Sequence, residues 1–196
     1  MKHKITVKEI CLVAFAVCIN IAGGQAALFL RLPIYLDSIG TIMTGVLLGP
    51  FYGMIPNLLS GIVMGMTTDI YSLYFAPVGM VTGFMSGLVA GVIRSNDSQK
   101  ARFPKAAVFL AAVAVTVPGT MLSAWICAKL FGGVTSSGSS ILVQLLSHTS
   151  LSMSASVFIV QIMTDYLDRV ISLYLVAGLV RVLPAEFKNM RRLWQS

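Results

Sequence analysis

The sequence predicts an all-α integral membrane protein built as a bundle of six transmembrane helices. Of its 196 residues, 57% are apolar and only 11% are charged, and the mean hydropathy is +0.86. A soluble domain carries about 25% charged residues. The charged residues of this chain separate uncharged runs that reach the roughly 20 residues a membrane span needs. This composition excludes a soluble enzyme, a disordered tail and a nucleic-acid-binding domain.

The placement of the basic residues predicts the topology. Eleven of the fourteen Lys and Arg residues lie before the first apolar run, in one internal loop and at the end of the chain. These residues are Lys2, Lys4, Lys8, Arg94, Lys100, Arg102, Lys105, Arg181, Lys188, Arg191 and Arg192. Such clusters mark the cytoplasmic side of a membrane. We therefore expect a multi-pass plasma-membrane protein with both termini in the cytoplasm; a DNA-binding basic face is the alternative interpretation.

Uncharged runs and helix-breaking residues divide the chain, a single membrane domain over 1–196, into spans. The run 10–30 is long enough to cross, which favours a retained helix over a cleaved signal peptide. The run 38–68 would make a helix of about 46 Å, too long for one span, and Gly49-Pro50 is the expected break. The predicted spans are 7–30, 34–49, 51–67, 75–94, 106–131 and 164–183.

Segment 139–163 is apolar enough to span, but it is rich in serine and carries Gln144, His148 and Gln161. A full span here would place the basic tail outside the cell, against the rule for basic residues. We therefore expect a helical hairpin or re-entrant element on the outer side, turning near His148, before the last span. The sequence leaves open whether this segment is a lid, a re-entrant hairpin or an extra span.

Acidic residues in or near membrane spans usually face a cavity or a partner. Four of the seven fall on the outer side of this topology, and they are Asp37, Asp69, Asp165 and Asp168. Asp165, Asp168 and Arg169 share one helix face. We expect Asp165 to pair with Arg169, which leaves Asp168 for a ligand, a neighbouring helix or water. The alternative is that Thr164 or Asp165 caps the helix.

The loops beside these acids carry further candidate binding residues. Asp37 falls in the first turn of the second predicted span, where helix amides favour negative charge, so simple capping competes with ligand binding. Arg31 and Tyr35 on the connecting loop would close over an external pocket. Tyr71, which two more aromatic residues follow, would join an interfacial belt or stack on a flat ring system.

Small residues recur every four positions on two predicted helices. They are Ala14, Cys18 and Ala22 on the first, and Gly79, Gly83, Gly87 and Gly91 on the fourth. Small residues at this spacing let helix backbones approach closely in lipid. Each stripe would serve either internal packing or the docking of another membrane subunit, and the sequence does not decide between them.

Nothing in the sequence indicates an enzyme or a metal centre. Common hydrolase, zinc-protease and phosphate-loop motifs are absent, and Asp165-x-x-Asp168 alone is a weak metal motif. The three cysteines lie in apolar runs without a C-x-x-C pair, and a metal site would need more ligands than the two histidines readily supply. We expect no catalytic residue, bound metal or cofactor in this chain.

Three segments give the chain a family resemblance. They are the stretch 32–41 (LPIYLDSIGT) followed by Leu48-Gly49-Pro50, the serine-rich loop 135–140, and Asp165-x-x-Asp168-Arg169-x-Ile171-Ser172. In this order they resemble the substrate-binding S components of energy-coupling factor (ECF) vitamin transporters. The resemblance covers about residues 7–184. Relatives often carry Lys where Arg169 stands.

The resemblance implies a function. S components bind a vitamin or related micronutrient from outside, and a loop after the first helix closes the pocket. The loaded protein joins a membrane coupling subunit and two cytoplasmic ATPases, which use ATP, and it is thought to topple to release its cargo. A small-residue A-x-x-x-A stripe on the first helix commonly docks the coupling subunit. The nearest match here is Ala14-x-x-x-Cys18, with Cys in place of Ala.

The residues and the resemblance together define an expected substrate site: Arg31, Tyr35, Asp37, Tyr71, Asp165, Asp168 and Arg169. Its excess of acids favours a ligand with an amine or ring cation, such as a pyridoxamine-like vitamer. Arg169 would instead hold an anion. A membrane sensor domain of similar fold and a scaffold protein without a small ligand are the alternative functions.

Overall fold

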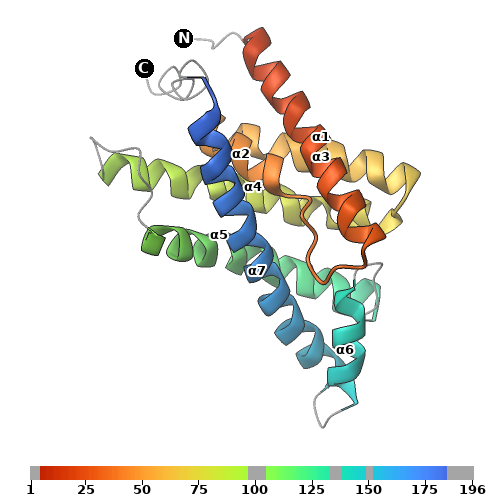
Figure 1. Cartoon of the computed structure of the whole chain (residues 1–196). Coiled ribbons are helices and arrows are strands. Elements are labelled where there is room, and N and C mark those ends of the chain that lie inside the picture. The colour runs from red at the N-terminus through yellow and green to blue at the C-terminus, as the bar shows by residue number, and fades with distance from the viewer. Residues whose placement is uncertain (1–4, 97–104, 133–137, 149–151, 185–196) are drawn as a thin grey trace.

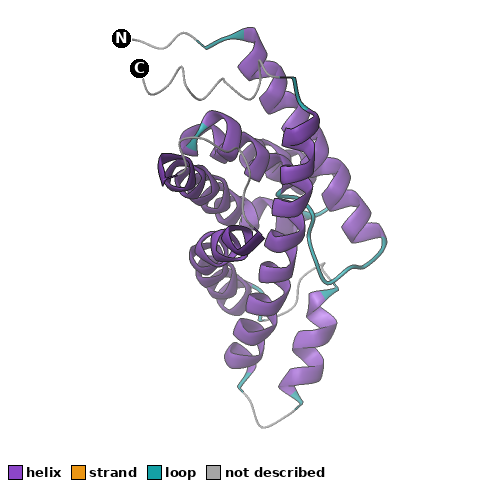
Figure 2. Ribbon diagram, turned by 60° about the vertical axis from the view of Figure 1, so that its left-hand side comes forward, coloured by secondary structure: helices purple, strands orange, loops and turns teal. Residues whose placement is uncertain are grey.

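The computed structural model describes residues 5–96, 105–132, 138–148 and 152–184. Within these ranges the protein is entirely helical (Figures 1 and 2), as the sequence predicts. The helices in chain order are α1 (Val7–Phe29), α2 (Ile39–Leu48), α3 (Pro50–Thr67), α4 (Ile70–Asn96), α5 (Lys105–Leu130), α6 (Ser139–Ser147) and α7 (Met153–Val182).

The exposed surface of the helices is strongly apolar. Phe15, Leu110 and Trp125 are 53%, 72% and 58% exposed, and many other large apolar side chains point outward. Helices α1, α4 and α5 are long and apolar enough to cross a membrane, and α2 is a shorter apolar helix. Exposed apolar surface on this scale marks contact with lipid or with another protein. These features indicate a membrane-embedded helical protein.

The helices pack in two groups that share α2. α3 lies along α4, α5 packs against α7, and α2 contacts α1, α3, α4 and α7. In Figure 1, α6 and the first turns of α7 extend beyond the rest of the bundle. The start of α1 and the end of α7 lie together at the opposite end (Figures 1 and 2).

α2 begins at Ile39, five residues later than the predicted start at 34. Arg31 and Leu36 in the preceding connection have φ values of 49° and 53°, in the left-handed region, which interrupts a regular helix. Asp37 therefore precedes the helix and does not lie in its first turn. The break after α2 falls at Gly49, as predicted, because its φ of 105° and ψ of 178° suit only glycine.

α7 begins at Met153, eleven residues before the predicted start at 164, so it continues through the second half of segment 139–163. The Ser152 hydroxyl accepts a hydrogen bond from the Ala155 amide and caps the helix, and no Gly or Pro interrupts the turns that follow. Thr164 lies inside the helix, where its hydroxyl donates to the Val160 carbonyl at 2.9 Å. The interpretation of Thr164 or Asp165 as an N-cap is therefore wrong.

α4 also begins early, at Ile70 and not at 75. The Asp69 carboxylate accepts from the Tyr71 amide and from the Ser72 hydroxyl, at 3.3 and 3.1 Å. These hydrogen bonds provide an acceptor for donor groups in the first turn of the helix, as an acidic N-cap does. Pro77 lies inside α4.

Glycine stripes allow α4 to lie directly against α3 and α2. A Cβ atom on Gly83 would overlap the backbone carbonyl of Gly53, and one on Gly87 would overlap the backbone of Pro50. The fourth-helix stripe therefore serves internal packing. By contrast, Ala14, Cys18 and Ala22 are all exposed on α1, because the buried face of that helix includes Leu12, Ala16 and Asn20 and packs on the rest of the bundle.

Candidate functional site

A buried charged cluster joins α7 to the connection between α1 and α2. Asp168 is 0% exposed and Arg169 is 6% exposed, and the two form an ion pair. Asp168 accepts from the Leu36 amide at 2.8 Å and from the Ser38 hydroxyl at 3.2 Å. Arg169 Nη1 donates to Ser38 Oγ at 2.6 Å. The side chains from α7 thus hold the connection in place.

Asp165 belongs to the same face of α7 but has a different partner. Arg169 forms its ion pair with Asp168, not with Asp165 as the spacing suggested, because the Arg169 side chain reaches Asp168 and Ser38 together. Asp165 instead accepts a hydrogen bond from Thr120 Oγ1 of α5 at 2.8 Å. The carboxylate is 4% exposed and forms no ion pair within the described residues.

Asp37 lies in the α1–α2 connection, outside the helices, beside a small cavity that is partly open to solvent. Tyr35, Asp69 and Ser72 give this cavity its other polar groups, and apolar residues such as Met64 complete its wall. Burial, and then the negative charge of Asp168, raise the pKa of Asp37 to about 6, while the charge of Arg169 acts in the opposite direction. The cavity therefore has an acidic wall.

Of the seven predicted site residues, Tyr35 and Asp37 line this cavity and the other five do not. Asp165, Asp168 and Arg169 lie in the buried cluster described above. Arg31 is exposed, and its carbonyl oxygen faces Gly138 at the start of α6 so closely that a Cβ on Gly138 would overlap it. Tyr71 packs edge-to-face on Phe131 at the end of α5, with ring centroids 4.7 Å apart. Tyr35 lines the cavity, and its hydroxyl lies 3.4 Å from Ser139 Oγ.

Other buried polar residues contact this cluster or lie on the same helices, and the predicted site does not include them. Ser38 and Thr120 bind the aspartates directly. Thr116, Gln161 and Ser172 are buried, and their side chains each carry an oxygen without a hydrogen-bond partner. Helical spacing could have indicated these residues, because residues four apart share one helix face. Thr116 lies four residues before Thr120 on α5. On α7, Gln161 lies four residues before Asp165, and Ser172 lies four residues after Asp168.

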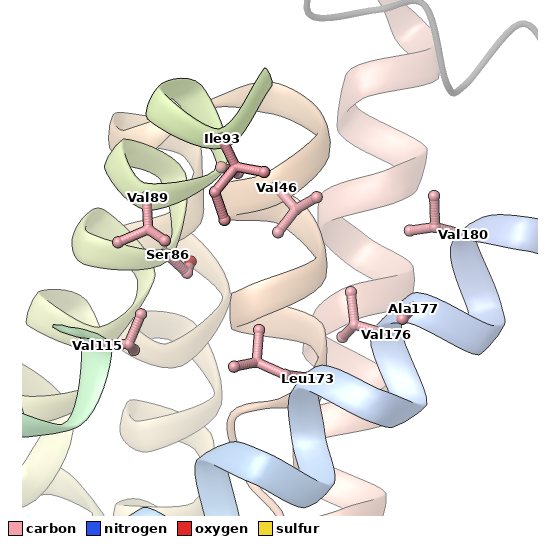
Figure 3. Close-up of a pocket in the computed structure, with 10 residues that line it drawn as sticks. Val46, Ser86, Val89, Ile93, Val115, Leu173, Val176, Ala177 and Val180 are labelled. Atoms are coloured by element: carbon pink, nitrogen blue, oxygen red, sulfur yellow. The ribbon is translucent and has the colours of Figure 1, made fainter. Parts of the chain in front are cut away.

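A second small cavity lies further along α7 (Figure 3). α2, α4, α5 and α7 line it with apolar side chains such as Val46, Val115 and Leu173. Its one hydroxyl, on Ser86, donates to the Gly83 carbonyl of the same helix at 2.8 Å. This cavity offers no charged group, so the acidic cavity and the adjoining cluster are the stronger candidate site.

The described residues include no group of three His, Cys, Asp or Glu side chains placed to hold a metal ion. Comparison of the chain with protein-family models, with curated proteins and with solved structures finds no match. The fold and the site define the protein as an all-helical, membrane-embedded chain with a buried charged cluster beside an acidic cavity. A function for it has to be argued from these residues.

Proposed function

We propose that this protein is the substrate-binding subunit of an ECF-type importer. In this proposal it binds a vitamin or related micronutrient from outside the cell and delivers it inward, together with a membrane coupling subunit and two ATPases. α1 to α5 and α7 are its six spans, α6 and the start of α7 lie on the outer side, and both termini are cytoplasmic. The chain has no catalytic role and carries no cofactor; its partners use the ATP.

The observation that carries the proposal is a contact between two segments of the family resemblance. Segment 32–41 and segment 165–172 are separated by more than 120 residues in the sequence. In the fold, Asp168 binds Leu36 and Ser38, and Arg169 binds Ser38. This contact supports the proposal, because the resemblance implies a loop after the first helix that closes the substrate pocket.

The exposed stripe on α1 supports a partner in the membrane. Ala14, Cys18 and Ala22 face away from the bundle, so the helix backbone is accessible along this line. Small residues let another helix pack closely in lipid, where van der Waals contact rather than the hydrophobic effect drives association. In the proposed complex this stripe contacts the coupling subunit.

Affinity purification of the tagged protein from its native membranes in mild detergent, read by mass spectrometry, tests the proposal. We expect a multi-helix coupling protein and two ABC-type ATPases to co-purify. Ala14→Leu with Ala22→Leu should abolish their recovery without loss of folded protein. Gly178→Leu is the matched control, because nothing lies within 4 Å of a Cβ at this exposed α7 position.

Two other results would contradict the transport proposal. Recovery of a kinase in place of the ATPases would indicate a membrane sensor. A stable preparation without any of these partners would indicate a scaffold protein.

A further inference from the structure

Asp165 is a buried carboxylate, and Arg169, the positive charge that acts on it within the described residues, already pairs with Asp168. Asp165 lies in the middle of α7, is 4% exposed, and accepts a hydrogen bond from the neutral Thr120 hydroxyl at 2.8 Å. It forms no ion pair within the described part of the chain. An ionised group buried in a membrane protein is strongly unfavourable unless a partner of opposite charge meets it.

The cationic side chain on the same face of α7 is committed elsewhere. Arg169 pairs with Asp168 and donates to Ser38 Oγ at 2.6 Å. Asp37 and Asp168 are close enough to add their negative charge to the surroundings of Asp165. Three carboxylates therefore share one guanidinium, and the excess charge around Asp165 is negative. Because Arg169 is engaged, it is also a poor receptor for an anion.

Gln161 supplies an independent sign of a missing ligand. It lies one helical turn before Asp165, on the same face of α7, and is 2% exposed. Its Oε1 atom has no hydrogen-bond partner among the residues that the structure describes. A buried amide oxygen loses its bonds to water and is costly to leave unpaired. A carboxylate and an amide oxygen are both acceptors, so the group that satisfies them together is a positively charged donor.

We propose that Asp165 and the Oε1 atom of Gln161 bind a positively charged group, the ammonium or protonated ring nitrogen of a small organic molecule. The Thr120 hydroxyl holds the Asp165 carboxylate in position for this contact. This inference rests on the proposed function for the direction of transport. It deepens that function by assigning the substrate to the class of organic cations. An inorganic monovalent cation would bind the same oxygen atoms, and the experiment below distinguishes an organic from an inorganic cation.

Ligand-dependent thermal stabilisation of the full chain, purified in detergent and an amine-free buffer, tests the proposal. The probes are matched pairs that differ in one group: pyridoxamine against pyridoxine, and tryptamine against tryptophol. Sodium, potassium and lithium chloride at equal ionic strength form the inorganic arm. We expect an amine to bind at least about tenfold more tightly than its alcohol, the scale of a buried charge-assisted hydrogen bond. Asp165→Asn should remove that preference.

Two Gln-to-Glu variants keep the test decisive if Asp165→Asn fails to fold. Gln161→Glu adds a second carboxylate at the site and should tighten amine binding. Gln144→Glu makes the same change at an exposed position of α6 and should leave binding unchanged. A salt-specific shift that Asp165→Asn abolishes, without any amine effect, would identify an inorganic cation as the ligand.

The proposal is overturned if the alcohols bind as tightly as the amines, or if no amine or salt produces an effect that depends on Asp165 or Gln161. This experiment uses the isolated subunit, so its outcome is separate from the co-purification test. If the protein shows no preference for amines but still co-purifies with two ATPases, it would be an importer of a neutral or anionic substrate.

Discussion

The carboxylate of Asp168 accepts a hydrogen bond from the backbone amide of Leu36 at 2.8 Å, across 132 residues of sequence. The same side chain binds the Ser38 hydroxyl and pairs with Arg169. Leu36 has a φ of 53°, so its amide does not continue a regular helix and needs another acceptor. This buried carboxylate of α7 therefore helps to fix the position of the α1–α2 connection.

Asp168→Asn should destabilise the protein and loosen the connection. The substitution leaves the Arg169 guanidinium buried without its carboxylate, and losing one member of a buried ion pair costs about 3–5 kcal/mol. Thermal unfolding in detergent should show the loss, and hydrogen exchange should become faster in segment 30–38. Asp168→Leu combined with Arg169→Met removes both charges and should cost less than the single change. A single variant as stable as the wild type would contradict this role for Asp168.

Asp37 should make the stability of the protein depend on pH. Its pKa is raised from 3.8 to about 6 in the folded protein, so the folded state holds the proton more tightly than the unfolded state does. The stabilisation is complete below about pH 4 and is lost as the pH rises through about 6. Thermal unfolding of the wild type and Asp37→Asn should therefore diverge, with the variant gaining relative stability between pH 4 and pH 7. If the difference in unfolding temperature between the wild type and Asp37→Asn does not change with pH, Asp37 does not titrate in this range.

Gly83→Ala should destabilise the bundle because the added Cβ would overlap the Gly53 carbonyl and force α3 away from α4. We expect a cost of about 2 kcal/mol or more, as for other overpacked cores. Gly178→Ala is the matched control, since its Cβ would meet no atom within 4 Å. This control should be neutral or stabilising by up to about 1 kcal/mol, the difference in helix propensity. Equal unfolding temperatures for the two variants would contradict the close contact of α3 and α4.

The cysteines should report which face of α1 is accessible. Cys18 and Cys11 are exposed, whereas Cys127 is buried, so a membrane-permeant maleimide should modify the first two faster in the isolated subunit. If the stripe that contains Cys18 docks a coupling subunit, assembly should protect Cys18. Mass spectrometry of labelled peptides before and after partner addition provides the readout, and Cys127 serves as the internal reference. Fast labelling of Cys127 would show that the α5 packing is wrong.

The sequence was a good guide to features that depend on local chemistry. The helical class follows from the apolar composition, and the break at Gly49 follows from a residue that tolerates a φ of 105°. Asp37, Asp165, Asp168 and Arg169 stood out because charges are rare in apolar runs. Each of these properties can be found without knowing which helices are neighbours.

Contacts between distant segments were the part that spacing could not predict. An arginine four residues after Asp165 and one after Asp168 can reach either carboxylate, and Ser38 from another helix decides between them. Thr120 was missed, and Gln161 was noted but not assigned to the site, because single uncharged polar residues are common in membrane helices. The predicted start of α7 at 164 is too late because the rule for basic residues assigns all of segment 139–163 to a separate hairpin, whereas α7 begins at Met153.

The glycine contacts have a mechanical consequence for how the bundle can move. Where Gly53 meets Gly83, and Gly87 meets Pro50, backbone lies against backbone without an intervening side chain. Such a contact cannot adjust by a change of side-chain rotamer, so we expect α3 and α4 to move together as one rigid unit. The interface of α5 with α7 is made by side chains such as Thr120 and Asp165, which can exchange partners without moving the backbone far. We therefore expect rearrangement between helices to be easier at the interface of α5 with α7 than at that of α3 with α4.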